Sequence, residues 1–127
     1  MNQAVIGIGS NIQPKANIER AIKRIAESHG ILNESSFVET EPLAGRDQPN
    51  YLNGAVLIQT SMGREELKDW LRELEGDLGR TRSTDRYDSR TIDLDIVVWS
   101  GEIVDKDVYE REFLRSAILE VCPGLNI

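Results

Sequence analysis

The sequence is poor in cysteine and histidine, with one cysteine, Cys122, and one histidine, His29, among 127 residues. A single cysteine excludes a disulfide within the chain and fits a reducing compartment. With one histidine, a Ser–His or Cys–His pair for nucleophilic catalysis is not expected. We expect Cys122 to fill a packing position and His29 to lie at the surface.

Long hydrophobic runs and a basic N-terminal region are also lacking. We therefore expect no membrane span, no signal peptide and a cytoplasmic location. The net charge of −7 argues against non-specific binding to nucleic acid. The composition, 39% hydrophobic and 29% charged, is that of an ordinary globular protein. The length predicts one domain over residues 1–127, and we expect it to be a monomer.

Hydrophobic periodicity and turn residues divide the chain into strands and helices. Strands are expected at residues 3–9, 31–40, 51–60, 92–99 and 103–104, and helices at 14–28, 63–78 and 111–121. The first six elements in chain order are strand, helix, strand, strand, helix and strand. This order predicts an α+β fold, a ferredoxin-like βαββαβ sandwich with a mainly antiparallel sheet and a short C-terminal extension. Both helices should then cover one face of the sheet and leave the other free for a ligand.

Two segments have too few hydrophobic residues for a regular buried element. Residues 41–50 contain two prolines and a glycine, which excludes a helix or strand and suggests a functional loop. Residues 80–90 contain four arginines: Arg80, Arg82, Arg86 and Arg90. Because the chain as a whole is acidic, this concentration of positive charge predicts a mobile loop that binds phosphate groups.

The arginine-rich segment leads directly into a strand in which Asp93 and Asp95 alternate with hydrophobic residues. The period of a strand places both carboxylates on one face, about 6.5–7 Å apart. Carboxylates at this spacing can bind Mg²⁺ together with nucleotide phosphates, and arginines beside them are typical of phosphoryl transfer. Asp-x-Asp is a short motif, however, and the same residues also fit a solvated sheet edge with arginines that neutralise nearby acids.

Five motifs occur in the order found in one known family: GIGSN at 7–11, ETEPL at 39–43, DQPNYLN at 47–53, ELEGDLGRTR at 73–82 and SRTIDLDI at 89–96. The chain resembles the 6-hydroxymethyl-7,8-dihydropterin pyrophosphokinases of folate biosynthesis, over about residues 4–104 and again over 110–125. The resemblance implies transfer of diphosphate from ATP to the pterin hydroxymethyl oxygen, with release of AMP and two Mg²⁺ ions. Such a reaction needs positioning and charge neutralisation rather than a covalent intermediate.

The resemblance also implies roles for individual residues. Asp93 and Asp95 would bind both metal ions. The triphosphate would meet Arg80, Arg82, Arg86 and Arg90, of which Arg80 and Arg90, together with Asp93 and Asp95, are the catalytic candidates. The nucleotide positions would be Glu75, Ile96 and Arg111, together with Arg82 and Arg86. The pterin would lie between the rings of Tyr51 and Phe113, with Asn53 reading its amide edge and Thr40 and Leu43 contributing largely through their backbone. Phe113 also fits a core position of the last helix.

The chain departs from the family pattern at three places. Tyr87 replaces the usual loop tryptophan, and Asp88-Ser89 replaces Gly-Pro before Arg90. Between Val104 and Arg111 the segment with a Pro-His-Pro-like turn is absent, which predicts weakened ATP binding. Two other functions therefore stay open: a pterin-binding paralogue with weak or lost ATP use, and a ferredoxin-like interaction domain with incidental charges.

Overall fold

A computed structural model describes residues 1–41, 48–79 and 91–127 of the chain. The strands are β1 (Asn2–Ser10), β2 (Gly30–Glu34), β3 (Val38–Thr40), β4 (Tyr51–Thr60), β5 (Asp93–Trp99) and β6 (Glu102–Ile103). The helices are α1 (Pro14–Ser28), α2 (Arg64–Asp77), α3 (Asp107–Glu110) and α4 (Glu112–Val121). Within the described residues, no helix has the length and hydrophobicity needed to span a membrane.

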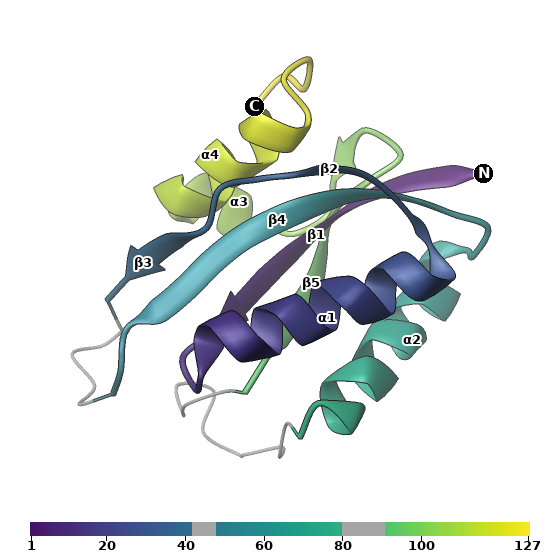
Figure 1. Cartoon of the computed structure of the whole chain (residues 1–127). Coiled ribbons are helices and arrows are strands. Elements are labelled where there is room, and N and C mark those ends of the chain that lie inside the picture. The colour runs from purple at the N-terminus through teal and green to yellow at the C-terminus, as the bar shows by residue number, and fades with distance from the viewer. Residues whose placement is uncertain (42–47, 80–90) are drawn as a thin grey trace.

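The strands form one sheet in the order β2–β4–β1–β5–β6, with β3 also paired to β4, and every pairing is antiparallel. The longest pairing joins β1 to β4 from Asn2↔Thr60 to Ser10↔Leu52. Strand β1 is thus central, between β4 and β5 (Figure 1). The predicted α+β, ferredoxin-like arrangement is confirmed.

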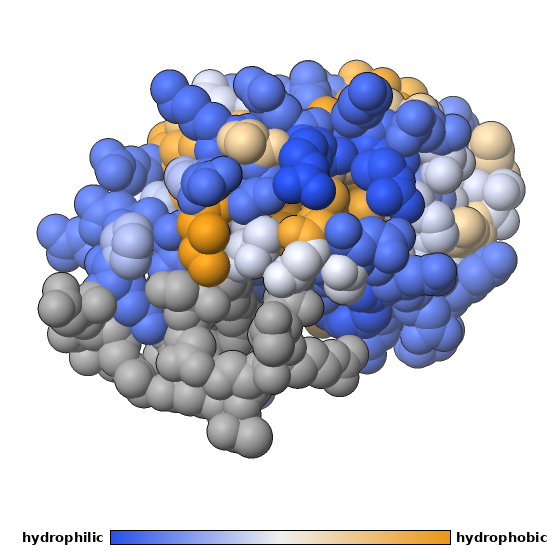
Figure 2. Space-filling model, turned by 60° about the horizontal axis from the view of Figure 1, so that its bottom comes forward, coloured by the Kyte–Doolittle hydropathy of each residue, from blue (hydrophilic) through white to orange (hydrophobic). Residues whose placement is uncertain are grey.

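Helices α1 and α2 pack on one face of this sheet (Figure 1). Their buried positions follow helical spacing, as the periodicity predicted: Ile18, Ala21 and Ile25 in α1, and Leu67, Leu71 and Leu74 in α2. Pro14 occupies the first turn of α1, where a missing backbone N–H is tolerated. The space-filling view in Figure 2 shows one face of the molecule, which is mostly hydrophilic and on which hydrophobic residues of the described part form small separate groups.

The second face of the sheet is not wholly free, contrary to the prediction. Helix α4 packs on it and shares a separate hydrophobic cluster with the strands, which includes Val5, Ala55, Leu114 and Ile118 (Figure 1). The sequence indicated the helix, but its hydrophobic stripe did not reveal which surface it would cover. A ligand is therefore confined to the part of this face that α4 leaves open.

The predicted strand at 31–40 is divided into β2 and β3. Ser35 lies at the break and exchanges two hydrogen bonds with Ala55: its N–H donates to the Ala55 carbonyl, and its Oγ accepts from the Ala55 N–H at 2.8 Å. The next residue, Ser36, donates its N–H to Glu120 of α4 at 2.8 Å. These side-chain contacts replace the regular ladder, so the chain bends without losing its hydrogen bonds.

The alternation predicted for β5 also fails at one point. The register against β1 shifts between Val5 and Ile6, so that Val97 is an extra residue in β5. Leu94 belongs to the core under α1 and α2, whereas Val97 and Val98 both belong to the core under α4. Such a bulge breaks the alternation of faces, and a sequence in which every residue from Ile96 to Val98 is hydrophobic does not reveal it.

The prediction that His29 lies at the surface is wrong. Its side chain follows α1 and is buried, with 8% exposure. Its Nδ1 lies 2.9 Å from Thr60 Oγ1, and its ring packs edge-on against Trp70 with the centroids 4.5 Å apart. Burial lowers the pKa of His29 below its ordinary value. Cys122, as expected, packs beside the core under α4.

Candidate active site

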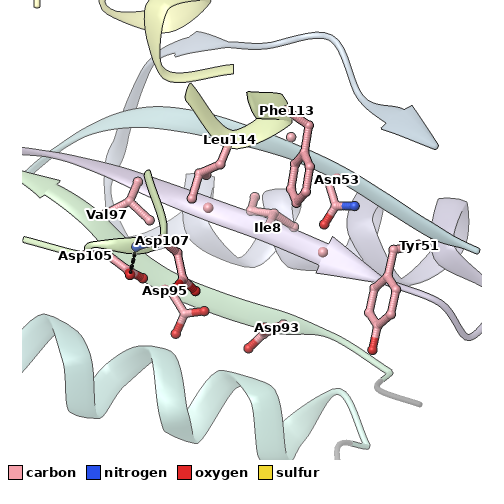
Figure 3. Close-up of a pocket in the computed structure, with 13 residues that line it drawn as sticks. Ile8, Tyr51, Asn53, Asp93, Asp95, Val97, Asp105, Asp107, Phe113 and Leu114 are labelled. Atoms are coloured by element: carbon pink, nitrogen blue, oxygen red, sulfur yellow. Dashed lines mark hydrogen bonds between the residues drawn. The ribbon is translucent and has the colours of Figure 1, made fainter. Parts of the chain in front are cut away.

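A pocket opens on the part of the sheet that α4 leaves uncovered (Figure 3). Its walls come from three strands, β1, β4 and β5, from helices α3 and α4, and from the loop before α3. Its floor is the glycine-rich end of β1, which includes Gly7 and Gly9. The other lining residues are Ile8, Tyr51, Asn53, Gly54, Asp93, Asp95, Val97, Asp105, Asp107, Phe113 and Leu114.

One half of the pocket presents an amide near two aromatic rings. Tyr51 and Asn53 extend from β4, and Phe113 extends from the first turn of α4 (Figure 3). Phe113 also packs beside the core under α4, so it lines the pocket while it contributes to that core. A flat heterocycle with a polar rim needs this combination of ring faces and hydrogen-bonding groups.

The amide of Asn53 is hydrogen-bonded on one side and lies over Gly9 on the other. Its Nδ2 donates to Thr40 Oγ1 at 2.6 Å, across the pairing of β3 with β4. On the other side, a Cβ built on Gly9 would lie 2.7 Å from Asn53 Oδ1. Asn53 thus occupies space that any larger residue at position 9 would take. Thr40 does not line the pocket, but its hydroxyl accepts the hydrogen bond that orients Asn53, which does.

The other half of the pocket is acidic. Asp93 and Asp95 both line it, so the prediction that they share a face is confirmed (Figure 3). Asp105 and Asp107, which precede and begin α3, line it as well. In the described part of the chain, however, no three acidic, histidine or cysteine side chains are grouped closely enough to hold a metal ion. A cation between Asp93 and Asp95 would therefore take further oxygen ligands from a phosphate or from water.

The environment of Asp95 opposes its negative charge. Burial raises the pKa of Asp95 to about 6, and the negative charge of Asp93 acts in the same direction, while the hydrogen bond and charge of Arg72 oppose them. A divalent cation would relieve this repulsion. The carboxylate pair thus fits a metal ion in its charge and in its oxygen donors.

A second pocket adjoins the first and has a different lining. It lies between α2, β5 and the loop before α3, and Ile96 contributes to its wall. Asp95 and Asp105 line both pockets, so the two cavities meet at these carboxylates. The remaining lining residues of the second pocket are Arg64, Glu65, Lys68, Leu71, Arg72, Val104 and Lys106.

The sequence analysis missed the cations of this second pocket. Arg64, Lys68 and Arg72 recur every four residues along α2 and so lie on one face of it, which is the pattern that could have revealed them. Their meeting with Lys106 depends on the packing of α2 beside β5. Asp105 and Asp107 were also missed, because they lie in the segment where the chain departs from the family pattern.

The structure places the other predicted residues as follows. Glu75 is buried, with 3% exposure, and lines neither pocket. Arg111 joins α3 to α4, lies 3.7 Å from Asp107 in an ion pair, and lines neither pocket. Five predicted residues lie outside the described residues: Leu43, Arg80, Arg82, Arg86 and Arg90.

The arrangement can bring two ligands together at one pair of carboxylates. A flat polar heterocycle fits the amide and ring half of the first pocket, and an anionic molecule fits the second, in which Arg64, Lys68 and Lys106 supply positive charge. A phosphate group that crossed from one pocket to the other would pass Asp95. Because carboxylates repel phosphates, a cation between them would favour this passage.

Comparisons with known proteins point the same way. Residues 5–123 match the family model described as 7,8-dihydro-6-hydroxymethylpterin-pyrophosphokinase. A Haemophilus influenzae protein named 2-amino-4-hydroxy-6-hydroxymethyldihydropteridine pyrophosphokinase is 32% identical, over 98% of this chain and 84% of its own length. A Bacillus subtilis protein of the same name is 34% identical, over 95% of this chain and 78% of its own length. The Pisum sativum mitochondrial folate synthesis bifunctional protein is 34% identical over 94% of this chain, which corresponds to 25% of that protein.

Proposed function

The chain belongs to the 7,8-dihydro-6-hydroxymethylpterin-pyrophosphokinase family, and from this premise we propose that it transfers diphosphate from ATP to 6-hydroxymethyl-7,8-dihydropterin. The observation that carries the proposal is the meeting of two unlike pockets at Asp95. The pocket with Tyr51, Asn53 and Phe113 takes the pterin, and the pocket lined by cations takes the nucleotide.

In the reaction, the pterin hydroxymethyl oxygen forms a bond to the β-phosphorus of ATP. The bond from that phosphorus to the oxygen bridging to the α-phosphorus breaks, AMP leaves, and the proton of the alcohol is released. Mg²⁺ supplies charge neutralisation at the transferred phosphates. The residues of the chain orient the two substrates: Asn53 reads the edge of the pterin, the aromatic rings fix its plane, and Asp93 and Asp95 hold the metal–phosphate complex.

The residues beyond the described part of the chain complete the proposal. Arg80 and Arg90 are proposed as the catalytic cations on the transferred phosphates, with Arg82 and Arg86 on the nucleotide. Leu43 is proposed to line the pterin site. The number of two Mg²⁺ ions, the monomeric state, the cytoplasmic location and the single domain stay predictions of the sequence.

The segment that replaces the family's histidine turn brings a different balance of charge. Asp105 and Asp107 face the first pocket, and Arg111 pairs with Asp107. Lys106 lines the second pocket and is the cation that this segment offers to a nucleotide. Residues 104–111 contain three acidic and two basic side chains, a net charge of −1. This charge supports the prediction of weak ATP binding, and it keeps a pterin-binding protein with little or no ATP use as the second candidate.

One assay tests both candidates. The protein is incubated with Mg-ATP and 6-hydroxymethyl-7,8-dihydropterin, and AMP is measured by chromatography. The matched control is the 6-methyl analogue, which keeps the ring and lacks the accepting oxygen. We expect AMP with the first compound and none with the second. Pterin binding by calorimetry without AMP release would favour the second candidate, and no pterin binding would refute both.

A further inference from the structure

Arg72, on the last half of α2, makes three polar contacts at the metal-binding carboxylates. Its Nη2 donates to Asp95 Oδ1 at 3.0 Å. Its Nη1 donates to the backbone carbonyl of Leu94 at 2.9 Å and to Glu75 Oε1 at 2.7 Å. The guanidinium is planar and rigid, so three contacts made at once fix its position.

Glu75 anchors this arrangement from inside the protein. Its side chain is 4% exposed, and its second carboxylate oxygen accepts the backbone N–H of Leu94 at 2.8 Å. Leu94 is thus held at its N–H by Glu75 and at its carbonyl by Arg72. Because Leu94 lies between Asp93 and Asp95, this clamp fixes the piece of strand that carries both carboxylates.

The same contacts constrain the side chain of Asp95. Oδ1 is engaged by Arg72, whereas no hydrogen bond within the described residues reaches Oδ2. The side chain of Asp95 is 40% exposed, and it lines both pockets. One oxygen is therefore fixed and the other is presented to the space where the two pockets meet.

We propose that Arg72 is a positioning residue that fixes Asp95 for the divalent cation. This inference rests on the proposed function, which places the metal at Asp93 and Asp95. Residues that orient metal-binding side chains in this way typically change metal affinity or activity 10- to 100-fold when they are replaced.

Arg72 could instead bind a nucleotide phosphate directly, but the charges around its guanidinium argue against this role. Two carboxylates, Glu75 and Asp95, contact its guanidinium. The group of three carries a net charge of about −1, which does not attract a phosphate. Arg64 and Lys68 lie on the same face of α2, and among the described residues neither is paired with an acid. They are the better phosphate contacts.

The test measures Mn²⁺ binding by electron paramagnetic resonance, in the presence of an ATP analogue with a non-hydrolysable α,β-methylene bridge. The variants are Arg72→Gln, Arg72→Lys and, as control, Arg24→Gln, which removes an exposed ion pair with Asp77 between α1 and α2. We expect the Mn²⁺ Kd to rise about 10- to 100-fold in Arg72→Gln. We expect a smaller rise in Arg72→Lys, which keeps the charge but makes fewer contacts, and a change within about twofold in the control.

An unchanged Mn²⁺ Kd in Arg72→Gln overturns the inference. If Arg72→Gln folds poorly, an unchanged Mn²⁺ Kd in Arg72→Lys overturns it instead.

A double-mutant cycle separates positioning from a direct role. In an Asp95→Asn background the metal ligand is already weakened, so Arg72→Gln should change the Mn²⁺ Kd by less than about twofold. The full effect of Arg72→Gln in that background would show that Arg72 acts on its own, which overturns the inference. If the wild-type protein releases no AMP, the result counts against the proposed function. If the wild-type protein releases AMP and Arg72→Gln leaves the Mn²⁺ Kd unchanged, the result counts against the positioning role alone.

Discussion

Replacement of Gly9 by alanine tests how Asn53 reads its ligand. The new Cβ would lie 2.7 Å from Asn53 Oδ1, closer than such atoms approach. The carbonyl oxygen of Leu52, which belongs to the backbone, would lie 3.9 Å from the new Cβ, an ordinary van der Waals contact. The amide must therefore rotate away, while β1 and β4 stay paired.

The expected effect falls on binding more than on stability. Two hydrogen bonds from the Asn53 amide to the pterin, at about 0.5–1.5 kcal/mol each, amount to about 1–3 kcal/mol. Their loss weakens pterin binding by roughly 5- to 150-fold. The free energy of unfolding should change by less than about 1 kcal/mol, because the loss of the Asn53–Thr40 hydrogen bond, worth about 0.5–1.5 kcal/mol, is offset by the restriction that alanine places on the unfolded chain.

Calorimetry with 6-hydroxymethyl-7,8-dihydropterin measures the first quantity, and urea unfolding measures the second. Gly30→Ala is the matched control, because its Cβ would meet nothing closer than Gln59 at 3.8 Å. Pterin binding within about twofold of wild type in Gly9→Ala would refute the reasoning that Asn53 reads the ligand from its observed position. An equal loss in Gly30→Ala would instead indicate a general effect on the sheet.

Three other outcomes follow from the structure. Asp93→Ala and Asp95→Ala should each abolish AMP release, because the metal–phosphate complex loses a ligand, and should leave the pterin Kd measured by calorimetry within a few-fold of wild type. Turnover within a few-fold of wild type in either variant would contradict the metal assignment. Gly54→Ala should lower the free energy of unfolding in urea by about 1–3 kcal/mol, because the new Cβ would lie 2.6 Å from the ring of Phe37, and an unchanged value would contradict that packing. Burial lowers the pKa of His29 from 6.5. The free energy of unfolding should therefore keep its full His29 contribution above about pH 6.5 and decrease as the pH drops toward the lowered pKa of the folded state, because in that range only the unfolded chain takes up the proton. Urea unfolding at several pH values should show a weaker dependence of this free energy on pH in His29→Gln, and an equal dependence would argue against the buried neutral imidazole.

The sequence by itself determined the features that are encoded within short segments. The helix at 14–28 and the strand at 51–60 were predicted with the bounds observed for α1 and β4. The shared face of Asp93 and Asp95 follows from the two-residue period of a strand, whatever packs against it. The family motifs are likewise contiguous runs of residues, so they can be recognised before any fold is known.

The tertiary structure alone decided which segments meet. Arg72 contacts Asp95 across 23 positions because α2 packs beside β5, and a pattern of charges along one helix does not specify its neighbour. The bulge at Val97 and the cover of α4 over the second face depend on how two hydrophobic surfaces fit together. The burial of His29 depends on Thr60 and Trp70, which come from other elements. Local periodicity fixes the direction of a side chain within its element, whereas the partner it meets is set by packing between elements.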